Sequence, residues 1–241
     1  IIFRQKKLSE IKNDFVNNMT HELKTPISTI SLASQMLSDD SIPVQNKNLS
    51  QISRIIDTES KRLGVQVEKV LQMAVFDKGF IKLKKKNKDF HEILDSAVNN
   101  FSLQIKKRGG ELKLLPDATN SMVNLDEVHM TNVISNLLDN AMKYSEENPV
   151  IIVKTFNKDN YLGISVKDNG IGISKEDQKR IFDKFFRVHT GNLHNVKGFG
   201  LGLSYVKKIV DIHDGFINLK SELNKGTTFE IFIPVIKQSY A

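Results

Sequence analysis

The sequence of 241 residues contains no cysteine, which excludes disulfide scaffolds, catalysis by a thiol and zinc sites built on cysteine. It has no apolar run near the roughly 20 residues that a membrane-spanning helix requires, so we expect that these residues do not cross a bilayer. Internal repeats and low-complexity segments are also missing. With 39% hydrophobic and 26% charged residues, the composition is that of a folded globular protein of one or two domains.

Basic residues outnumber acidic ones. The 35 lysines and arginines against 28 aspartates and glutamates give a net charge of +7. Such a surplus is compatible with nucleic acid, an acidic protein partner or a polyphosphate ligand, and it does not choose among them. The sequence shows no helix or basic-aromatic module that reads nucleic acid, so we expect no nucleic-acid partner.

The first residues form an apolar stub, Ile1 to Phe3, that is followed at once by Arg4, Lys6 and Lys7. This order resembles the cytoplasmic end of a membrane-spanning helix, although the frayed start of a helix explains it equally well. We therefore expect a cytoplasmic location, with membrane association only through a segment upstream of these residues.

Apolar residues recur every three or four positions over residues 8–37 and again over residues 49–74, which predicts two long helices. A polar stretch with a proline at residues 39–43 separates them, so the helices should form an antiparallel hairpin. A lone hairpin leaves part of both apolar stripes exposed, and a homodimeric four-helix bundle would bury it. The alternative is a hairpin that packs against the domain that follows it.

A different pattern begins after residues 77–79, with a lysine-rich stretch, and we place a domain boundary there, between a domain at 1–77 and one at 80–241. The pattern predicts helices at 91–107, 127–144 and 202–211. Strands are expected around Leu112 and Met122 and at 150–156, 161–167, 216–219 and 228–233, with 157–160 as a turn. The sequence therefore predicts an α+β protein, a helical hairpin followed by an α/β two-layer sandwich with a mixed sheet.

The first helix carries His21 on the side opposite to its apolar stripe, together with Lys24 and Thr25. Pro26 lies within the helix, where it cannot donate a hydrogen bond to Glu22, and it should loosen the turn beside His21. An exposed histidine alone is usually an ordinary surface residue, but the combination H-E-L-K-T-P is much less ordinary.

A polar stripe of Asn132, Asn136, Asn140 and Lys143 is embedded in apolar flanks on the helix expected at 127–144. Polar side chains in such flanks need partners. Carboxamide oxygens suit a magnesium ion that takes its other ligands from water and phosphates, and a lysine would neutralise phosphate charge. A solvated helix face whose amides cap nearby loops explains the stripe equally well.

Two glycine-containing turns complete the candidate site. Asp168 ends an expected strand, where its carboxylate can accept a hydrogen bond from an adenine amino group, and Gly170 and Gly172 allow the backbone to approach a flat ligand. The stretch G-F-G-L-G-L at 198–203 opens a helix whose N-terminus attracts anions. It is neither a Rossmann fingerprint nor a Walker loop.

Five motifs in order resemble those of the sensor histidine kinases of two-component signalling: H-E-L-K-T-P from His21, N-L-L-D-N-A-M-K-Y-S from Asn136, D-N-G-I-G-I from Asp168, I-F-D-K-F-F-R-V from Ile181 and G-F-G-L-G-L from Gly198. The resemblance covers nearly the whole chain. It implies that residues 1–77 are a dimerisation and histidine phosphotransfer domain. Residues 80–241 would be an ATP-binding catalytic domain of the Bergerat type.

The resemblance also implies residue roles. His21 would be the phosphoacceptor, Glu22 would polarise or deprotonate its imidazole, and Thr25 would take part in dephosphorylating the partner. Arg187 would reach the γ-phosphate, and Asn140 with Asn136 would bind magnesium. The other nucleotide-binding residues would be Lys143, Tyr144, Asp168, Gly170, Gly172, Ile173, Phe182, Gly198, Gly200, Leu201, Gly202 and Leu203, with residues 188–197 as a lid that Phe182, Phe185 and Phe186 anchor.

The function implied is that of an ATP-dependent protein-histidine kinase. As a homodimer it would phosphorylate itself on His21 with ATP and Mg²⁺ and pass the group to an aspartate in the receiver domain of a response regulator, which it would also dephosphorylate. An ATP-hydrolysing member of the same fold and a catalytically silent, nucleotide-binding dimeric scaffold remain as alternatives. Related ATPases carry a glutamate in place of Asn136, and an amide cannot accept a proton from water, so hydrolysis should be slow unless Asp139 takes that role.

Overall fold

The computed structural model describes residues 2–39, 48–77, 82–145, 147–188 and 200–236. The chain divides into two compact units, Ile1–Ile81 and Lys82–Ala241. Within the described ranges, no helix is both long enough and apolar enough to cross a membrane.

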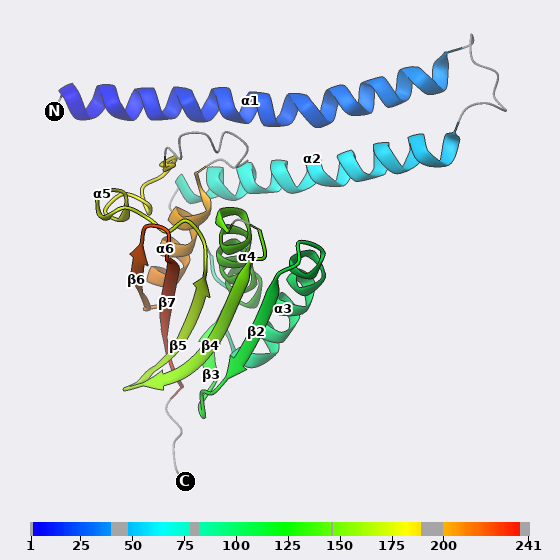
Figure 1. Cartoon of the computed structure of the whole chain (residues 1–241). Helices are drawn as coiled ribbons and strands as arrows, with labels where there is room; N and C mark the ends of the chain where they lie inside the picture. The colour runs from blue at the N-terminus through cyan, green and yellow to red at the C-terminus, as the bar shows by residue number, and fades with distance from the viewer. Residues whose placement is uncertain (1, 40–47, 78–81, 146, 189–199, 237–241) are drawn as a thin grey trace. The chain divides into compact units, whose positions relative to one another are not determined.

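The first unit is a helical hairpin, as predicted. Helix α1 spans Ile2–Ser38 and α2 spans Leu49–Asp77, and the two run side by side (Figure 1). The stretch expected to break the pattern at 39–43 lies almost wholly outside the described residues. Pro26 does not end α1; beside it, the hydroxyl of Thr25 donates to the carbonyl of His21 at 3.2 Å, and that of Thr29 donates to the carbonyl of Thr25 at 3.0 Å.

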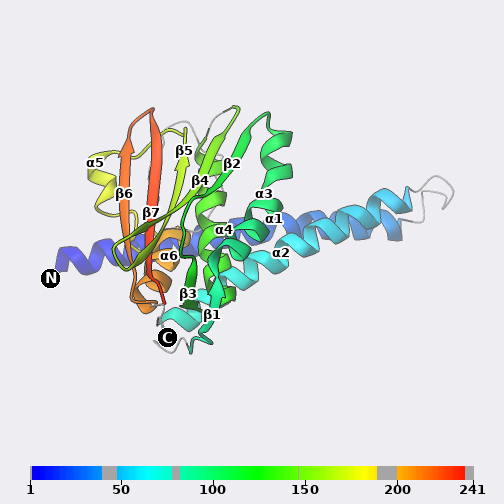
Figure 2. The same cartoon turned by 90° about the horizontal axis from the view of Figure 1, so that it is seen from below.

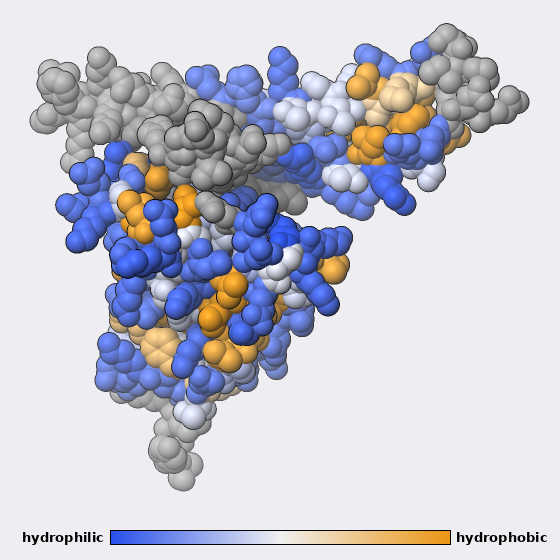
Figure 3. All heavy atoms as spheres, in the orientation of Figure 1, coloured by the Kyte–Doolittle hydropathy of each residue, from blue (hydrophilic) through white to orange (hydrophobic). Residues whose placement is uncertain are grey.

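Part of the apolar surface of this hairpin stays uncovered. Ala33 and Ile52 are buried between the helices, but Leu32 is 60% exposed and Leu49 is 49% exposed. Figure 3 shows hydrophobic side chains gathered near the end of the hairpin where α1 ends and α2 begins. The hairpin alone therefore does not bury its stripes, as the sequence indicated.

The second unit is a two-layer α/β sandwich, which confirms the predicted fold class. Five strands form its main sheet in the order β2-β4-β5-β7-β6, with β2 parallel to β4 and the other neighbours antiparallel. They span Glu111–Pro116 (β2), Val150–Lys158 (β4), Tyr161–Asp168 (β5), Phe216–Glu222 (β6) and Gly226–Pro234 (β7). Helices α3 (Phe90–Lys107), α4 (Glu127–Tyr144) and α6 (Gly202–Ile212) cover one face of this sheet (Figures 1 and 2).

Alternating residues of the strands face these helices and form the core. On β5, Leu162, Ile164 and Val166 are buried, and Asp168 continues the same face at the end of the strand. Met130 and Leu137 of α4 are likewise buried. The alternation therefore carries one carboxylate to the edge of an apolar core.

Three local details differ from the sequence predictions. The strand expected near Met122 is β3 (Met122–Leu125), but it pairs with β1 (Lys86–Asp89) in a separate small sheet; β1 was not predicted because K-N-K-D has no apolar alternation. The four-residue turn expected at 157–160 is wrong: Lys158 pairs with Tyr161, which leaves a two-residue turn. The short helix α5 (Lys175–Gln178) was also not predicted.

Candidate functional site

A cleft opens in the second unit. Its walls come from α4, the end of β5, the segment that follows β5, the start of α6 and β7. The lining residues are Asn140, Tyr144, Asp168, Ile171, Gly172, Ile173, Ile181, Phe186, Arg187, Val188, Leu203, Thr227 and Phe229. Seven of the predicted site residues are thus brought together: Asn140, Tyr144, Asp168, Gly172, Ile173, Arg187 and Leu203.

Asp168 is the buried carboxylate of this cleft. Its Oδ1 accepts hydrogen bonds from the backbone N–H of Gly170 at 2.8 Å and of Thr227 at 3.0 Å, while Oδ2 makes none within the described part of the chain. Burial raises the pKa of this carboxyl, against the two backbone hydrogen bonds, which lower it. One oxygen is therefore fixed by the fold, and the other remains available as an acceptor for a ligand.

The two glycines after Asp168 are needed for contacts within the chain itself. Gly172 has φ +69°, and a β-carbon there would lie 2.0 Å from the carbonyl oxygen of Glu222. A β-carbon on Gly170 would lie 2.5 Å from the carbonyl oxygen of Tyr144. The sequence reasoning assigned both glycines to close approach of a ligand, but the close approach that the structure shows is to backbone of β6 and α4.

Only two of the four predicted site residues on α4 line the cleft. Asn140 and Tyr144 line it, and Tyr144 has its pKa raised by burial, with Arg187 lowering and Asp139 raising it. Asn136 and Lys143 are not among the lining residues. The Asn136 amide donates to the carbonyl of Asn132 at 2.8 Å, and the Lys143 ammonium lies 2.6 Å from the Asp139 carboxylate.

The amides of α4 fit only some metal ions. Among the described residues there is no cluster of three or more acidic, histidine or cysteine side chains that suits a metal ion. Asn140 of α4 lines the cleft, and the oxygens of carboxamides such as its own are neutral and hard. They fit a magnesium ion that obtains its remaining oxygens from phosphates and water.

The start of α6 lies next to Asn136. A β-carbon on Gly202 would come within 2.7 Å of the Asn136 Oδ1, so the glycine permits this close packing of α6 on α4. Gly200 has φ +68°, and its carbonyl accepts a hydrogen bond from the N–H of Phe185 at 2.9 Å. Gly200, Leu201 and Gly202 do not line the cleft, whereas Gly198 and nearly all of the expected lid at 188–197 lie outside the described residues.

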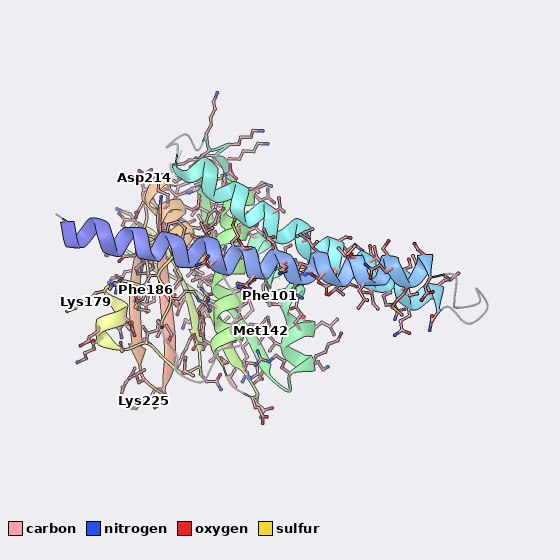
Figure 4. All side chains as sticks on the ribbon, turned by 90° about the horizontal axis from the view of Figure 1, so that it is seen from above. Phe101, Met142, Lys179, Phe186, Asp214 and Lys225 are labelled. Carbon is pink, nitrogen blue, oxygen red and sulfur yellow. The ribbon has the colours of Figure 1, made fainter. Side chains whose placement is uncertain are left out.

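The segment from Ile181 to Val188 forms one wall. Phe182, predicted to bind nucleotide, is not among the lining residues, and its ring packs edge-on against Phe229 with ring centroids 6.4 Å apart. Phe186 lines the cleft, and the Arg180 guanidinium lies 4.4 Å from the centroid of its ring. Phe186 and Lys179, the residue after α5, are both labelled in Figure 4.

Six residues that line the cleft were not among the predicted site residues: Ile171, Ile181, Phe186, Val188, Thr227 and Phe229. The first four lie in or beside motifs that the sequence reasoning had already singled out, so those motifs were the available signal. Thr227 and Phe229 reach the cleft through the antiparallel pairing of β7 with β5, where Phe229 faces Val166. That long-range pairing has no local signal in the sequence.

The first unit holds the other candidate residues. His21 and Thr25 are exposed on α1, as predicted for both, and Glu22 is half-buried. Across the hairpin, the Nε2 of Gln66 on α2 lies 3.5 Å from the Oε2 of Glu22. His21, Glu22 and Thr25 thus form a separate group from the residues of the cleft.

The fold and cleft of the second unit define a nucleotide-binding ATPase-type domain, joined to a helical hairpin with an exposed histidine. Residues 125–237 match the family of histidine kinase-, DNA gyrase B- and HSP90-like ATPases, and residues 11–79 match the His Kinase A (phospho-acceptor) domain. The chain belongs to the sensor histidine kinases.

Individual proteins agree with this assignment. The sensor protein RprX of Bacteroides fragilis is 55% identical over 239 residues, which cover 98% of this chain and 46% of RprX. The chain thus spans less than half of that relative. The catalytic domain of histidine kinase ThkA is 27% identical, with a TM-score of 0.56, over 63% of this chain and 96% of that one. ThkA in complex with the response regulator protein TrrA shares the fold at 24% identity, with a TM-score of 0.64, over 97% of this chain and 64% of that one.

Proposed function

We propose that this chain is an ATP-dependent protein-histidine kinase that phosphorylates itself on His21. The observation that carries the proposal is the pairing of two parts in one chain. One is an exposed histidine within a phospho-acceptor domain, and the other is a cleft lined by Asn140 and Asp168 within an ATPase-type domain. In this proposal the two parts correspond to the predicted domains at 1–77 and 80–241.

In this proposal the cleft and the residues beside it offer a donor or acceptor for each part of ATP. Asp168 Oδ2 accepts a hydrogen bond from the adenine amino group, and the apolar side chains of Ile173 and Leu203 contact the ring. Asn140, assisted by Asn136, holds Mg²⁺, which supplies charge balance on the phosphates when it is bound. The start of α6 presents backbone N–H groups to the phosphates. Lys143 leaves Asp139 to bind phosphate, and Arg187 reaches the γ-phosphate.

The transfer step forms one bond and breaks one. A neutral ring nitrogen of His21 attacks the γ-phosphorus in line with the leaving oxygen, so a P–N bond forms as the P–O bond to ADP breaks. Glu22 accepts a hydrogen bond from the N–H of the other ring nitrogen, which leaves the attacking nitrogen unprotonated, and it takes that proton as the P–N bond forms, so that the ring ends neutral. Arg187 stabilises the charge that develops on the transferred group.

The phosphoryl group then passes to an aspartate of a response regulator. His21 is exposed, so a partner protein can reach it, and the fold is that of ThkA, which has been seen in complex with a response regulator. Thr25, one turn beyond His21, positions a water molecule that hydrolyses the phosphorylated aspartate of that partner. A second copy of the chain covers the apolar side chains that the hairpin leaves exposed.

ATP hydrolysis is the main rival activity, and the geometry of α4 disfavours it. The position of a hydrolytic base is held by Asn136, whose amide cannot accept a proton. Asp139 is the other candidate base, and it is not among the residues that line the cleft. A silent scaffold that only binds nucleotide is the second rival. Membrane association and a cytoplasmic location stay predictions from the sequence.

The test uses ATP labelled in its γ-phosphate and Mg²⁺. We expect the chain to become labelled with phosphate that is lost in acid and kept in base, as a P–N bond requires. His21→Ala should abolish the label, whereas His91→Ala, in the second unit, should not. Labelling that persists without His21 would overturn the proposal. Repeated ATP turnover without labelling would support the hydrolase, and nucleotide binding with neither would support the scaffold.

A further inference from the structure

Two polar residues interrupt the apolar seam of α2. Positions 52, 56, 59, 63 and 66 are spaced alternately by four and three residues, which is the spacing of a helix face that packs along another helix. Three of these positions are isoleucine or leucine. Glu59 and Gln66 occupy the other two, and Gln66 is only 7% exposed.

The side chain of Gln66 is poorly satisfied as a structural group. Its Oε1 is buried and has no hydrogen-bond partner within the described residues. Oε2 of Glu59 is also buried without a hydrogen bond, but it lies 3.5 Å from the Arg62 guanidinium in an ion pair. A buried carboxamide oxygen without a partner lowers stability, and an apolar residue at this seam position would avoid that penalty. The stability of the hairpin alone therefore gives no reason for a glutamine here.

The amide nitrogen of Gln66 suggests why a glutamine occupies this position. Its Nε2 lies 3.5 Å from the Oε2 of Glu22, the residue that follows His21. Gln66 lies seventeen positions after the start of α2, and His21 lies seventeen before the end of α1, so an antiparallel hairpin brings them level. An amide N–H on one carboxylate oxygen restricts rotation of the carboxylate and leaves its second oxygen for another partner.

We propose that Gln66 is a positioning residue for Glu22: it holds one carboxylate oxygen, so that the other is directed to the imidazole of His21. This inference rests on the proposed phosphorylation of His21. In the transfer step, Gln66 takes no proton and touches no phosphate. It raises the fraction of time that Glu22 spends in the orientation in which it serves the ring nitrogen that does not attack.

A purely structural role would look different. Polar residues in helix seams can set the register or the number of helices in a bundle at a cost in stability. In that case, removal of the amide would change the assembly of the hairpin. In the positioning role, removal of the amide leaves assembly and ATP binding as they are and slows only the transfer to His21.

The experiment measures initial rates of self-phosphorylation by the full chain over a range of ATP concentrations. Gln66→Leu keeps a similar volume and removes the amide, and we expect kcat to fall about tenfold with an unchanged KM for ATP. Its melting temperature should equal or exceed that of the original chain, because an unpaired polar group has been removed from the seam. Gln66→Glu keeps the shape but opposes Glu22 with a second carboxylate, so its kcat should fall further.

The matched control is Gln51→Leu, an exposed glutamine on the same helix, which should leave kcat and KM unchanged. An unchanged kcat in Gln66→Leu, or a Gln66→Glu variant that is as active as the original chain, would overturn the proposal. So would a change of sedimentation behaviour in Gln66→Leu, which would assign the residue to register instead. Absence of His21 labelling in the original chain refutes the proposed function itself, before any variant of Gln66 is compared.

Discussion

Gly202, the first residue of α6, lies so close to Asn136 of α4 that a β-carbon on the glycine would come within 2.7 Å of the Asn136 Oδ1. This contact joins two of the recognised motifs, which are far apart in the sequence. It places the free N–H groups at the start of α6 beside the asparagine that is proposed to assist Mg²⁺. The phosphate end of the proposed site therefore depends on a glycine that does not itself line the cleft.

Gly202→Ala should weaken ATP binding about tenfold, because the new methyl group must displace the Asn136 amide. Stability should change by less than about 1 kcal/mol, since alanine favours a helix and the displaced atom ends a flexible side chain. Titration calorimetry with ATP and Mg²⁺, together with urea unfolding, measures both quantities. Gly64→Ala is the control: a β-carbon there meets nothing within 4 Å, so that variant should gain about 1 kcal/mol of stability at constant ATP affinity. Unchanged ATP affinity in Gly202→Ala would contradict the assignment.

Asp168→Asn should shift the preference of the proposed nucleotide site from adenine toward guanine. Its Oδ1 can keep both backbone hydrogen bonds, but an NH₂ donor replaces Oδ2 and opposes the adenine amino group. We expect ATP affinity to fall at least about tenfold and GTP, whose base presents an acceptor there, to bind better relative to ATP. Competition of both nucleotides against a fluorescent analogue measures the ratio. An exposed control, Asp95→Asn on α3, should leave the ratio as it was.

The same substitution has a consequence for stability. Burial raises the pKa of Asp168 in the folded protein, so ionisation of this carboxyl opposes folding. The stability present while the group is protonated is lost as pH rises through the raised pKa. Asp168→Asn should therefore be at least as stable as the original chain at neutral pH, as urea unfolding would show. A variant that is less stable and also binds ATP normally would contradict this interpretation.

His213 should make the second unit sensitive to mild acid. Its Nδ1–H donates to the carbonyl of Ile209 at 2.8 Å, and its Nε2 accepts from the N–H of Asp126 at 3.0 Å, so the buried ring is held neutral. Burial lowers its pKa from the ordinary value of 6.5, with Lys85 and His129 acting in the same direction and the Ile209 hydrogen bond and Asp126 opposing. A lowered histidine pKa means that the full stability is present above about pH 6.5 and is lost as pH falls through the lowered value.

The size of this loss should be on the order of 1 kcal/mol, the contribution of a buried hydrogen bond that a protonated ring cannot accept. Urea unfolding between about pH 8 and pH 5 would reveal it. His213→Gln cannot titrate, and its stability should vary less with pH over the same range. Identical pH profiles for the two proteins would show that another group is responsible.

Thr25→Ala should separate the two proposed activities of the hairpin. Among the described residues, the hydroxyl of Thr25 bonds only to the carbonyl of His21 in its own helix, so its loss should leave the helix and self-phosphorylation nearly unchanged. Loss of phosphate from a phosphorylated receiver protein should slow at least about tenfold if this hydroxyl positions the attacking water. Thr29→Ala, one turn further along α1, is the control. Equal loss of both activities in Thr25→Ala would indicate a structural role.

Local patterns in the sequence were sufficient to predict those helices and strands that bury one face of their own. The apolar periodicity of α4 predicted its bounds at Glu127 and Tyr144, and the alternation in β5 placed Asp168 at the end of a strand. The polar strand β1 was not predicted, because it is held by pairing with β3 and has no apolar face of its own. The role of Thr227 in the cleft was not predicted, because only the folded sheet brings its N–H to Asp168.

Individual roles were harder to predict than the elements that carry them. The sequence indicated that Gly170 approaches something closely, but not that the neighbour is the Tyr144 carbonyl. It also placed Lys143 on the phosphates, whereas the structure pairs it with Asp139, because an (i, i+4) ion pair is available on the same helix. Contacts between residues distant in sequence, such as Gln66 with Glu22, required the hairpin itself.

The most direct test of the central claim is to locate the phosphoryl group by tandem mass spectrometry after incubation of the full chain with ATP and Mg²⁺, with neutral conditions kept throughout. The account predicts a single modified residue, His21, and no modification when Asn140→Ala removes the proposed magnesium ligand. Phosphate on a serine, threonine or another histidine, with His21 unmodified, would contradict the account.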